Sequence, residues 1–327
     1  MTVQPHLSVV IPTYHRPQLL LRCLKAVLRQ QRIEPAAYEV VVVDDGHDDE
    51  TRRLVDELRQ RSATPVRYLR PPAGRGPAVA RNAGWRAAVG EVIAFTDDDT
   101  VPSLLWLLEG ERILRQHPDW SAACGRVIVP VHEPPTDHAR MTQGLATAEF
   151  VTANAFVRRS ALEAVDGFDE RFTRAWREDS DLQFRLIEQV GPVGRAPLAD
   201  VVHPVREAPW GLSLSQQRNT FFDALLYKKH PRRYRTQVRP VPPWSYYAMV
   251  LLTLLALGLL AAGQAQAAGV AALGVAVLVL RFAWQRLRHT SHRPGHVFEM
   301  LCTSAVIPFL SVYWRLRGAL HFRVLFL

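Results

Sequence analysis

Two long runs without a charged residue constrain this chain more than any other feature. Residues 244–262 (WSYYAMVLLTLLALGLLAA) form the first run, and residues 265–280 form the second. A helix needs about 20 apolar residues to span a bilayer, so the first run qualifies, and the second qualifies if it extends to Trp284. Only Gly263 and Gln264 separate them, which is too little for a domain. The sequence therefore predicts a transmembrane helical hairpin over residues 244–284.

Basic residues bracket this hairpin on both sides. The flanking sequences are KKHPRRYRTQVR at residues 228–239 and RFAWQRLRHTSHR at residues 281–293. Positively charged flanks stay on the cytoplasmic side of a membrane. We therefore expect a multi-pass protein of the inner (cell) membrane, in contact with the lipid bilayer, whose N-terminal domain is cytoplasmic. A buried helix pair in a soluble protein would leave the basic brackets unexplained.

A third apolar run, residues 297–314, leaves two alternatives open. It contains Glu299 and Pro308. Three arginines follow it, namely Arg315, Arg317 and Arg323. A span would place these arginines outside, against the charge rule, so an interfacial or re-entrant helix competes with a third span. We expect residues 285–327 to form a basic loop and this membrane-spanning or interfacial helix.

The net charge of +9 belongs to the C-terminal part. Residues 224–327 hold 13 Lys and Arg against a single acid, Glu299, whereas residues 1–223 hold 27 Lys and Arg against 30 Asp and Glu. A nucleic-acid-binding surface would have to use the arginines that bracket the membrane spans, while the folded part is net acidic. We therefore expect no nucleic-acid partner.

The part before the hairpin alternates short apolar runs with amphipathic segments. Strands are predicted at residues 7–11, 40–43, 66–69 and 92–95, and helices from Pro17, around residues 54–58 and over residues 79–88. The order βαβαβαβ predicts an α/β fold with a mainly parallel, doubly wound sheet, in which ligands bind beyond the carboxyl ends of the strands. Two of those ends carry clustered aspartates, at residues 44–45 and 97–99, so they indicate one site.

Three adjacent aspartates, Asp97, Asp98 and Asp99, favour a metal site. Their carboxylates repel one another, and Mg²⁺ or Mn²⁺, which prefers oxygen ligands and is usually shared with a substrate phosphate, would relieve that cost. A solvated turn is the competing interpretation, because Asp is a common turn residue. His203, in VVHPVRE, is a further candidate ligand for a metal or a phosphate, although a lone histidine is more often structural.

A second acidic cluster, EDSD at residues 178–181, precedes a predicted helix. Acids in a first helical turn favour the helix dipole and cap free N–H groups, which would explain them without a function. The functional interpretation is a carboxylate base beside a metal-bound leaving group.

Missing motifs exclude several classes of protein. The chain has no GxxxxGK[ST] phosphate loop, no GxSxG, no HExxH and no kinase signature. Its three cysteines lie far apart and form no CxxC pair, which argues against a disulfide framework and a structural zinc site.

Assembled in order, six segments resemble the family 2 glycosyltransferases of the GT-A fold. They are SVVIPTYHRP (8–17), VVVDDG (41–46), GPAVARNAGWRAAVGEVIAFTDDDTVP (76–102), TANAFVRRSALEAVDGFDERF (152–172), REDSDLQFRL (177–186) and ADVVHPVRE (199–207). The resemblance implies a Rossmann-like GT-A domain, which we place at residues 1–227, with a basic juxtamembrane linker at residues 228–243 before the membrane helices. It also implies a nucleotide-diphosphate sugar donor, Mg²⁺ or Mn²⁺, and inversion at the anomeric carbon.

The resemblance implies a role for each matching residue. Asp179 matches the catalytic base, and Glu178 matches its partner near the acceptor. Asp97 and Asp99 match the DxD pair, with Asp99 the favoured direct metal ligand, and His203 matches a histidine that often completes the metal site. The positions that match nucleotide contacts are Pro12, Thr13, Tyr14, Arg16, Asp44, Asp45, Arg81, Asn82, Asp97 and Asp98.

A single displacement fits these roles. One positioned carboxylate can remove the acceptor proton, and a metal with Arg81 or His203 can neutralise the departing diphosphate. The QxxRW motif of the processive polysaccharide synthases is missing, since the nearest stretch is QQRNT at residues 216–220. We therefore expect one sugar per encounter, moved to a lipid-linked or membrane-proximal glycan acceptor in cell-envelope synthesis. A UDP-sugar donor is favoured, with GDP- and dTDP-sugars left open.

Two other functions stay open. A sugar-phosphate nucleotidyltransferase would carry a Gly-rich loop with Arg and Lys after the first strand, where this chain has PTYHRP. A catalytically silent membrane protein would bind nucleotide-sugars or partners through a decayed site, against which the intact Asp99, Asp179 and His203 argue.

Overall fold

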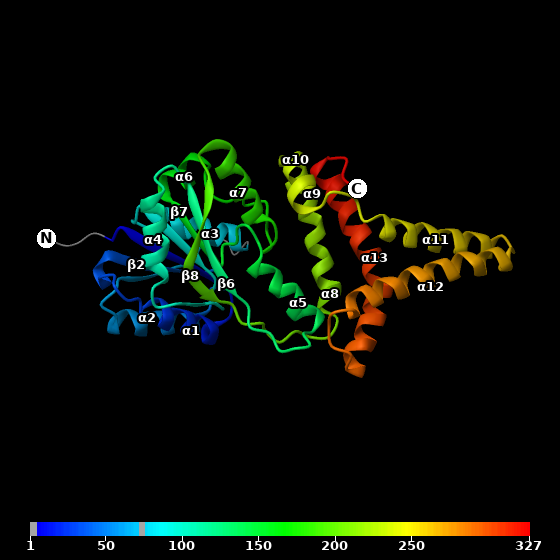
Figure 1. Ribbon diagram of the computed structural model, residues 1–327, viewed down its shortest axis with the longest axis horizontal. Coiled ribbons are helices and arrows are strands. Elements are labelled where there is room, and N and C mark those ends of the chain that lie inside the picture. Colours follow the sequence, from blue (N-terminus) through cyan, green and yellow to red (C-terminus); the bar gives the residue numbers. More distant parts are fainter. Residues whose placement is uncertain (1–4, 72–75) are drawn as a thin grey trace. The chain divides into compact units, whose positions relative to one another are not determined.

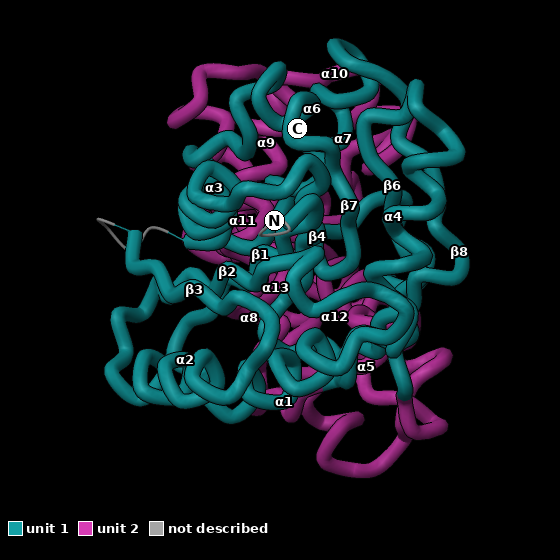
Figure 2. The backbone as a smooth tube through the Cα atoms, turned by 90° about the vertical axis from the view of Figure 1, so that its left-hand side faces the viewer, with its two compact units in different colours: residues 1–130, 144–205 teal, residues 131–143, 206–327 magenta. Residues whose placement is uncertain are grey.

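The computed structural model describes residues 5–71 and 76–327. The described residues form two compact units, coloured separately in Figure 2. The first unit comprises residues 1–130 and 144–205, and the second comprises residues 131–143 and 206–327. A short segment, residues 131–143, therefore leaves the first unit and returns to it.

Within the described residues, the first unit is built on one eight-stranded sheet (Figure 1). Its strands are β1 (Leu7–Thr13), β2 (Tyr38–Asp44), β3 (Val66–Leu69), β4 (Val92–Thr96), β5 (Val101–Pro102), β6 (Ala122–Ile128), β7 (Asn154–Arg158) and β8 (Val193–Val202). They lie in the order β3-β2-β1-β4-β7-β6-β8-β5. Strands β1 to β4 run parallel, as do β6 and β8, whereas β7 is antiparallel to β4 and β6, and β5 to β8. The prediction of a mainly parallel α/β sheet is confirmed.

Alternation along the central strands supplies a hydrophobic core on each face of the sheet. Val41 and Val43 pack into one core with side chains of α3, and Val40 and Val42 pack into the other with side chains of α1 and α2. All four valines are fully buried. A strand buried on both faces is continuously apolar, which is why this run stands out in the sequence.

Local signals explain where the helices of the first unit begin. They are α1 (Pro17–Val27), α2 (Asp49–Arg61), α3 (Pro77–Ala87), α4 (Trp106–Gln116), α6 (Arg159–Ala164) and α7 (Glu178–Gln189), with short 3₁₀ turns η1 (Pro35–Ala37) and η2 (Gly144–Ala146). Prolines open α1 and α3, where a missing N–H costs nothing. The carboxylate of Asp48 caps α2 by accepting from the backbone N–H groups of Glu50 and Thr51.

The close packing of α3 on the sheet brings its first turns to the site. A Cβ atom added at Gly84 would lie 2.4 Å from Cγ1 of Val10 and 3.0 Å from Cγ2 of Val43, so only glycine allows this approach. The carboxyl ends of β1, β2 and β4 lie at the same edge because these strands are parallel. Arg81, on α3, therefore lies where the aspartate-bearing turns are expected.

The second unit is helical. Its elements are α5 (Asp137–Gln143), α8 (Leu212–Ser215), the 3₁₀ turn η3 (Gln216–Asn219), α9 (Thr220–Lys229), α10 (Pro231–Arg233), the π-helical turn η4 (Tyr234–Val238), α11 (Trp244–Ala261), α12 (Ala265–Leu287) and α13 (Pro294–Phe322). Among the described residues, α11, α12 and α13 are long and apolar enough to cross a membrane, which indicates membrane association. The turn between α11 and α12 uses Gly263 at φ 75°.

The division into units differs from the domain boundary expected at residue 227. Residues 206–227 belong to the second unit, and the expected linker over residues 228–243 contains α10 and η4. Within that stretch Tyr234 is buried and packs against Tyr227 and Phe326, at ring-centroid distances of 5.6 and 5.3 Å. A basic, proline-flanked stretch is typical of a linker, so the local sequence predicts one here. The contacts of this stretch with residues near the C-terminus depend on the fold and could not be predicted from the local sequence.

Candidate active site

The turn after β4 places its three aspartates in different environments. Asp97 is partly exposed, whereas Asp98 and Asp99 are buried. Both the backbone N–H and the hydroxyl of Thr100 donate to the carbonyl oxygen of Asp97, at 3.3 and 2.8 Å. The turn is therefore closed by hydrogen bonds and fixes where each carboxylate points.

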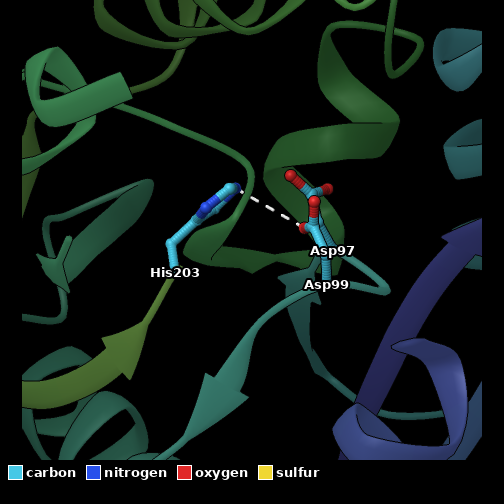
Figure 3. Close-up of side chains that lie close together, drawn as sticks. All are labelled: Asp97, Asp99 and His203. Atoms are coloured by element: carbon cyan, nitrogen blue, oxygen red, sulfur yellow. Dashed lines mark ion pairs between the residues drawn. The ribbon is translucent and has the colours of Figure 1, made fainter. Parts of the chain in front are cut away.

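Asp97 and Asp99 converge with His203, which follows the last residue of β8. Ligand atoms from the three side chains lie within 4.8 Å of one another, and Nε2 of His203 lies 3.5 Å from Oδ1 of Asp99 (Figure 3). Among the described residues, none hydrogen-bonds the buried Nδ1 of His203. A buried polar atom without a partner costs free energy, which a bound group would relieve. Two carboxylates and an imidazole fit a divalent cation such as Mg²⁺ or Mn²⁺.

Asp98 faces the loop after β1. Its carboxylate accepts a hydrogen bond from the Thr13 hydroxyl at 2.8 Å and one from the Arg16 guanidinium at 3.3 Å. Burial raises the pKa of Asp98 to about 6, against the opposing effect of Arg16. The structure thus brings together Thr13, Arg16 and Asp98, for which the family resemblance implies contacts with the donor nucleotide.

Arg81 joins the metal-binding cluster to the second acidic cluster. Its guanidinium is buried and donates to Asp97 Oδ1 at 2.8 Å and to Glu178 Oε1 at 3.0 Å. Its guanidinium carbon also lies 5.8 Å from the ring centroid of Phe168. One fixed positive charge therefore connects two acidic groups that are 81 residues apart in the sequence.

Glu178 and Asp179 begin α7 directly after Arg177, whose φ of 74° is in the left-handed region. Burial and the charge of Asp179 together raise the pKa of Glu178 to about 7, against the lowering effect of Arg81. Burial also raises the pKa of Asp179, against a hydrogen bond from the Ser180 N–H at 2.7 Å. A half-buried carboxylate with a raised pKa is suited to accept a proton.

The two aspartates after β2 shape loops. Asp44 accepts from the N–H groups of Gly46 and Asp48, at 2.9 and 2.7 Å, and from the Tyr68 hydroxyl at 2.6 Å. Asp45 accepts from the N–H of Gly76, at the start of α3, at 2.9 Å. These bonds hold the turn after β2 against the start of α3.

Asn82 has a set of structural contacts. Its amide donates to the Phe168 carbonyl and to Glu170, both at 2.9 Å. Its oxygen accepts from the Trp85 indole at 2.9 Å and from the Phe168 N–H at 2.8 Å. The side chain thus ties the turn around residue 168 to α3, and the expected nucleotide contact stays a prediction.

Pro12 and Tyr14 lie at the end of β1. Pro12 is half-buried within the strand, whereas the Tyr14 side chain is 56 % exposed and meets His15 edge to face at a ring-centroid distance of 4.4 Å. Tyr14 therefore offers an open aromatic face at the edge of the site.

Two residues of α1 that support the aspartate turn were missed by the sequence analysis. The Cys23 thiol lies 3.4 Å from the Asp97 carbonyl oxygen and 3.8 Å from the Thr100 hydroxyl. The Arg22 guanidinium donates to the Asp99 carbonyl at 3.2 Å. One cysteine and one arginine on an amphipathic helix carry no signal in a single sequence, so only the fold reveals this support.

Comparison with known sequences gives matches over part of the chain. Residues 8–169 match the model of the family described as glycosyl transferase family 2. Over 222 residues the chain is 32 % identical to the pre-mycofactocin glycosyltransferase of Mycobacterium tuberculosis, covering 61 % of this chain and 43 % of the relative. Over 95 residues it is 33 % identical to the GalNAc(5)-diNAcBac-PP-undecaprenol beta-1,3-glucosyltransferase of Campylobacter jejuni, covering 29 % and 30 %. The chain thus spans less than half the length of these curated relatives.

A solved structure resembles nearly the whole chain. It is the mannosyltransferase PcManGT from Pyrobaculum calidifontis in complex with GDP-Man and Mn²⁺, with a TM-score of 0.61 and 20 % sequence identity. The superposition covers 96 % of this chain and 88 % of the other. This likeness shows that the two chains share a fold.

Proposed function

We propose a sugar-transfer reaction for this chain, which belongs to glycosyl transferase family 2 and has a GT-A-like fold. In this proposal a single sugar moves from a nucleotide-diphosphate donor to an acceptor hydroxyl, with inversion at the anomeric carbon. The observation that carries the proposal is the cluster of Asp97, Asp99 and His203, which Arg81 connects to the acids at the start of α7.

Asp97, Asp99 and His203 would hold one Mg²⁺ or Mn²⁺ ion. A cation bound there would supply positive charge to the diphosphate as it leaves. The solved relative PcManGT contains Mn²⁺ and GDP-Man, which supports this assignment. Arg81, fixed between two carboxylates, would add a positive charge beside the same group.

The donor nucleotide would bind beside the carboxyl ends of β1 and β2, which the residues predicted to contact it follow. The exposed ring of Tyr14 offers a stacking face, and Arg16 and Asp45 offer a charged donor and an acceptor at the same edge. These groups suit a nucleoside diphosphate, and we expect a UDP-sugar, with GDP- and dTDP-sugars as the alternatives to test.

Asp179 would act as the base. Its carboxylate would take the proton from the acceptor hydroxyl, whose oxygen attacks the anomeric carbon. The bond from that carbon to the diphosphate oxygen breaks, and its electron pair leaves with the nucleotide. Glu178, held by Arg81, would position the adjacent Asp179. A single displacement of this kind inverts the anomeric centre.

The acceptor would be lipid-linked or close to the membrane. Three helices of the second unit are apolar enough to cross a bilayer, and the Campylobacter relative is named for an undecaprenol-linked substrate. Together with the basic residues that flank the hairpin, these observations support our proposal of an inner-membrane protein whose catalytic unit works at the cytoplasmic surface.

Nucleotide release from a panel of UDP-, GDP- and dTDP-sugars tests this function. The purified, detergent-solubilised full chain is assayed with Mg²⁺, with Mn²⁺ and with EDTA. We expect metal-dependent release that Asp179→Asn lowers by about 10²- to 10⁴-fold. The matched control is Asp166→Asn, an exposed aspartate of the same unit, which keeps the wild-type rate. Donor binding without release, even with lipid-linked acceptors, would instead identify a silent binding protein.

A further inference from the structure

The helix α13 carries an apolar stripe on its exposed side. The exposed apolar side chains recur every three or four positions along most of its length; the stripe consists of Phe298, Leu301, Ala305, Tyr313, Leu316 and Leu320. Side chains at this spacing lie on one side of a helix. Leu320 is 80 % exposed and Phe298 is 63 % exposed, so the stripe has no cover within the described chain at either end.

The opposite side of α13 is buried and makes polar contacts. Glu299 accepts a hydrogen bond from the Gly211 N–H at 2.8 Å. Thr303 and Ser304 accept from the Arg286 guanidinium, at 2.7 and 3.1 Å. Further along, the buried Arg315 lies 3.7 Å from a carboxylate oxygen of Asp223. A helix with one packed side and one exposed apolar side either lies in a membrane interface or faces lipid within the bilayer, so the residues beside α13 must distinguish the two arrangements.

The segment from α8 to α9 follows α13 along its length. Gly211 contacts Glu299 near the start of α13, and Lys228 donates to the Phe322 carbonyl at its end, at 2.8 Å. Between these points, a Cβ atom added at Gly318 would lie 2.5 Å from the Phe221 carbonyl oxygen. The polar residues of the neighbouring segment include Arg218, Asp223, Lys228 and Lys229.

A third span would draw this charged segment into the bilayer with α13. Arg218, beside Trp314, and Asp223, paired with Arg315, would enter the membrane with α13, and a charged side chain at the centre of a membrane costs about 2.5–3.5 kcal/mol or more. The hydrogen bonds that tie the segment to α13 would have to break for α13 to enter alone. Packing and charge therefore both keep α13 out of the hydrocarbon core.

The base of the α11–α12 hairpin, which is the end opposite its turn, lies beside α13 (Figure 1). Arg286, close to the end of α12, contacts Thr303 and Ser304, and further out the hairpin is exposed, with Leu257 at 59 % and Val270 at 72 %. Figure 1 shows α9 on one side of α13 and the hairpin projecting from the other. A hairpin that crosses the bilayer in this arrangement leaves α13 running along the membrane surface.

We propose that α13 is an in-plane interfacial helix and that the chain crosses the membrane only through α11 and α12. The partner of the apolar stripe is the bilayer surface, at the boundary between headgroups and acyl chains. Exposed basic residues near this helix and at the base of the hairpin, namely Arg281, Arg288, Arg317 and Arg323, suit anionic headgroups. Both ends of α13 then lie on the same side of the membrane as the catalytic unit.

Depth measurements along the stripe test this proposal. In the full chain carrying Cys302→Ser, single cysteines at Phe298, Ala305, Tyr313 and Leu320 are labelled with a fluorophore and reconstituted into vesicles with anionic lipid. Lipids that carry a quencher group at a shallow or a deep position of the bilayer then report the depth of each fluorophore. We expect all four sites to respond to the shallow quencher alone, while Leu251→Cys, in the middle of α11, responds to the deep one. Deep quenching at Ala305 and Tyr313, with shallow quenching at both ends, would show a third span and overturn the proposal.

The side of the membrane gives an independent test. In the full chain carrying Cys302→Ser, in which the remaining Cys23 and Cys124 are buried, Arg323→Cys, Gln264→Cys in the hairpin turn and Glu163→Cys in the catalytic unit are each labelled with an impermeant maleimide in sealed inverted vesicles. We expect Arg323→Cys to label like Glu163→Cys, and Gln264→Cys to be protected until detergent is added. If Arg323→Cys is protected together with Gln264→Cys, α13 crosses the membrane and the proposal is wrong.

Discussion

Arg81 is the side chain on which the charge balance of the site depends. It is buried between Asp97 and Glu178 and donates to both carboxylates. Their negative charges raise the pKa of Arg81 against the lowering effect of burial, so it stays charged. A buried charge is tolerated when it is paired, and removing one partner leaves the other uncompensated.

Replacing Arg81 by Met should therefore destabilise the first unit strongly. We expect a loss of about 3–5 kcal/mol in the free energy of unfolding, because the buried Glu178 and the partly exposed Asp97 lose their shared partner. The matched control is Arg86→Met, which removes a half-exposed arginine from the same helix and should cost at most about 1 kcal/mol. Chemical unfolding of the detergent-solubilised chain measures both, and equal losses would contradict the account.

Replacing Asn82 by Ala distinguishes a structural role of this side chain from a contact with the nucleotide. Asn82→Ala removes four hydrogen bonds, three of which tie the turn around residue 168 to α3, so we expect the free energy of unfolding to fall by about 2–4 kcal/mol. Calorimetric titration with nucleoside diphosphate should give an unchanged Kd. A weaker Kd with unchanged stability would instead support the nucleotide contact that the family resemblance implies.

Glu178 should make stability depend on pH in a defined direction. Burial raises its pKa from 4.5 to about 7, so the folded protein holds a proton that the unfolded chain has already released. The contribution of this group to stability therefore falls as the pH rises through that interval. Thermal unfolding of Glu178→Gln, which does not titrate, should improve relative to wild type between about pH 5 and pH 8. A difference that stays constant over this range would show that Glu178 does not titrate there.

Among the elements, strands β1 to β4 were easier to predict than β6, β7 and β8. The continuous valines of β2 made a buried strand evident, and Pro17 marked the start of α1. Strands β6, β7 and β8 carry no such pattern. Arg126 interrupts the apolar run of β6, β7 is only five residues long, and β6 and β8 pair with a register shift beside Gly125. Long-range pairing, not local hydrophobicity, decides that these segments are strands.

The close packing of α3 on the sheet at Gly84 leads to a prediction about the stability of the first unit. Gly84→Ala forces a methyl group against Val10 and Val43, so α3 must shift, and we expect a loss of about 1–3 kcal/mol of stability. Because α3 carries Arg81, nucleotide release should also slow. Gly144→Ala is the control, since a Cβ atom there meets no described atom within 4 Å. Equal stability of the two variants would contradict the close approach.

At the scale of the whole molecule, the site was more predictable than the division into units. The two aspartate clusters follow predicted strands, and the shared edge of a parallel sheet brings such ends together. His203 could be proposed only as one of several possibilities, because nothing local says that β8 ends beside Asp99. The path of residues 131–143 into the second unit was not predictable, because it rests on the buried pair of Asp137 with Arg286, which is 149 residues away.

Adding metal back to stripped protein tests whether Asp97, Asp99 and His203 form a metal site that the reaction needs. Protein stripped with EDTA is titrated with Mn²⁺ while nucleotide release from the best donor is followed. We expect wild-type nucleotide release to vanish in EDTA and to return with Mn²⁺. His203→Ala should need about 10- to 100-fold more Mn²⁺ for half-maximal release, the loss in metal affinity that is typical when even an outer partner of a metal site is removed. Asp99→Asn should need still more. Release that persists in EDTA, or identical Mn²⁺ dependence in all three proteins, would contradict a metal site formed by Asp97, Asp99 and His203.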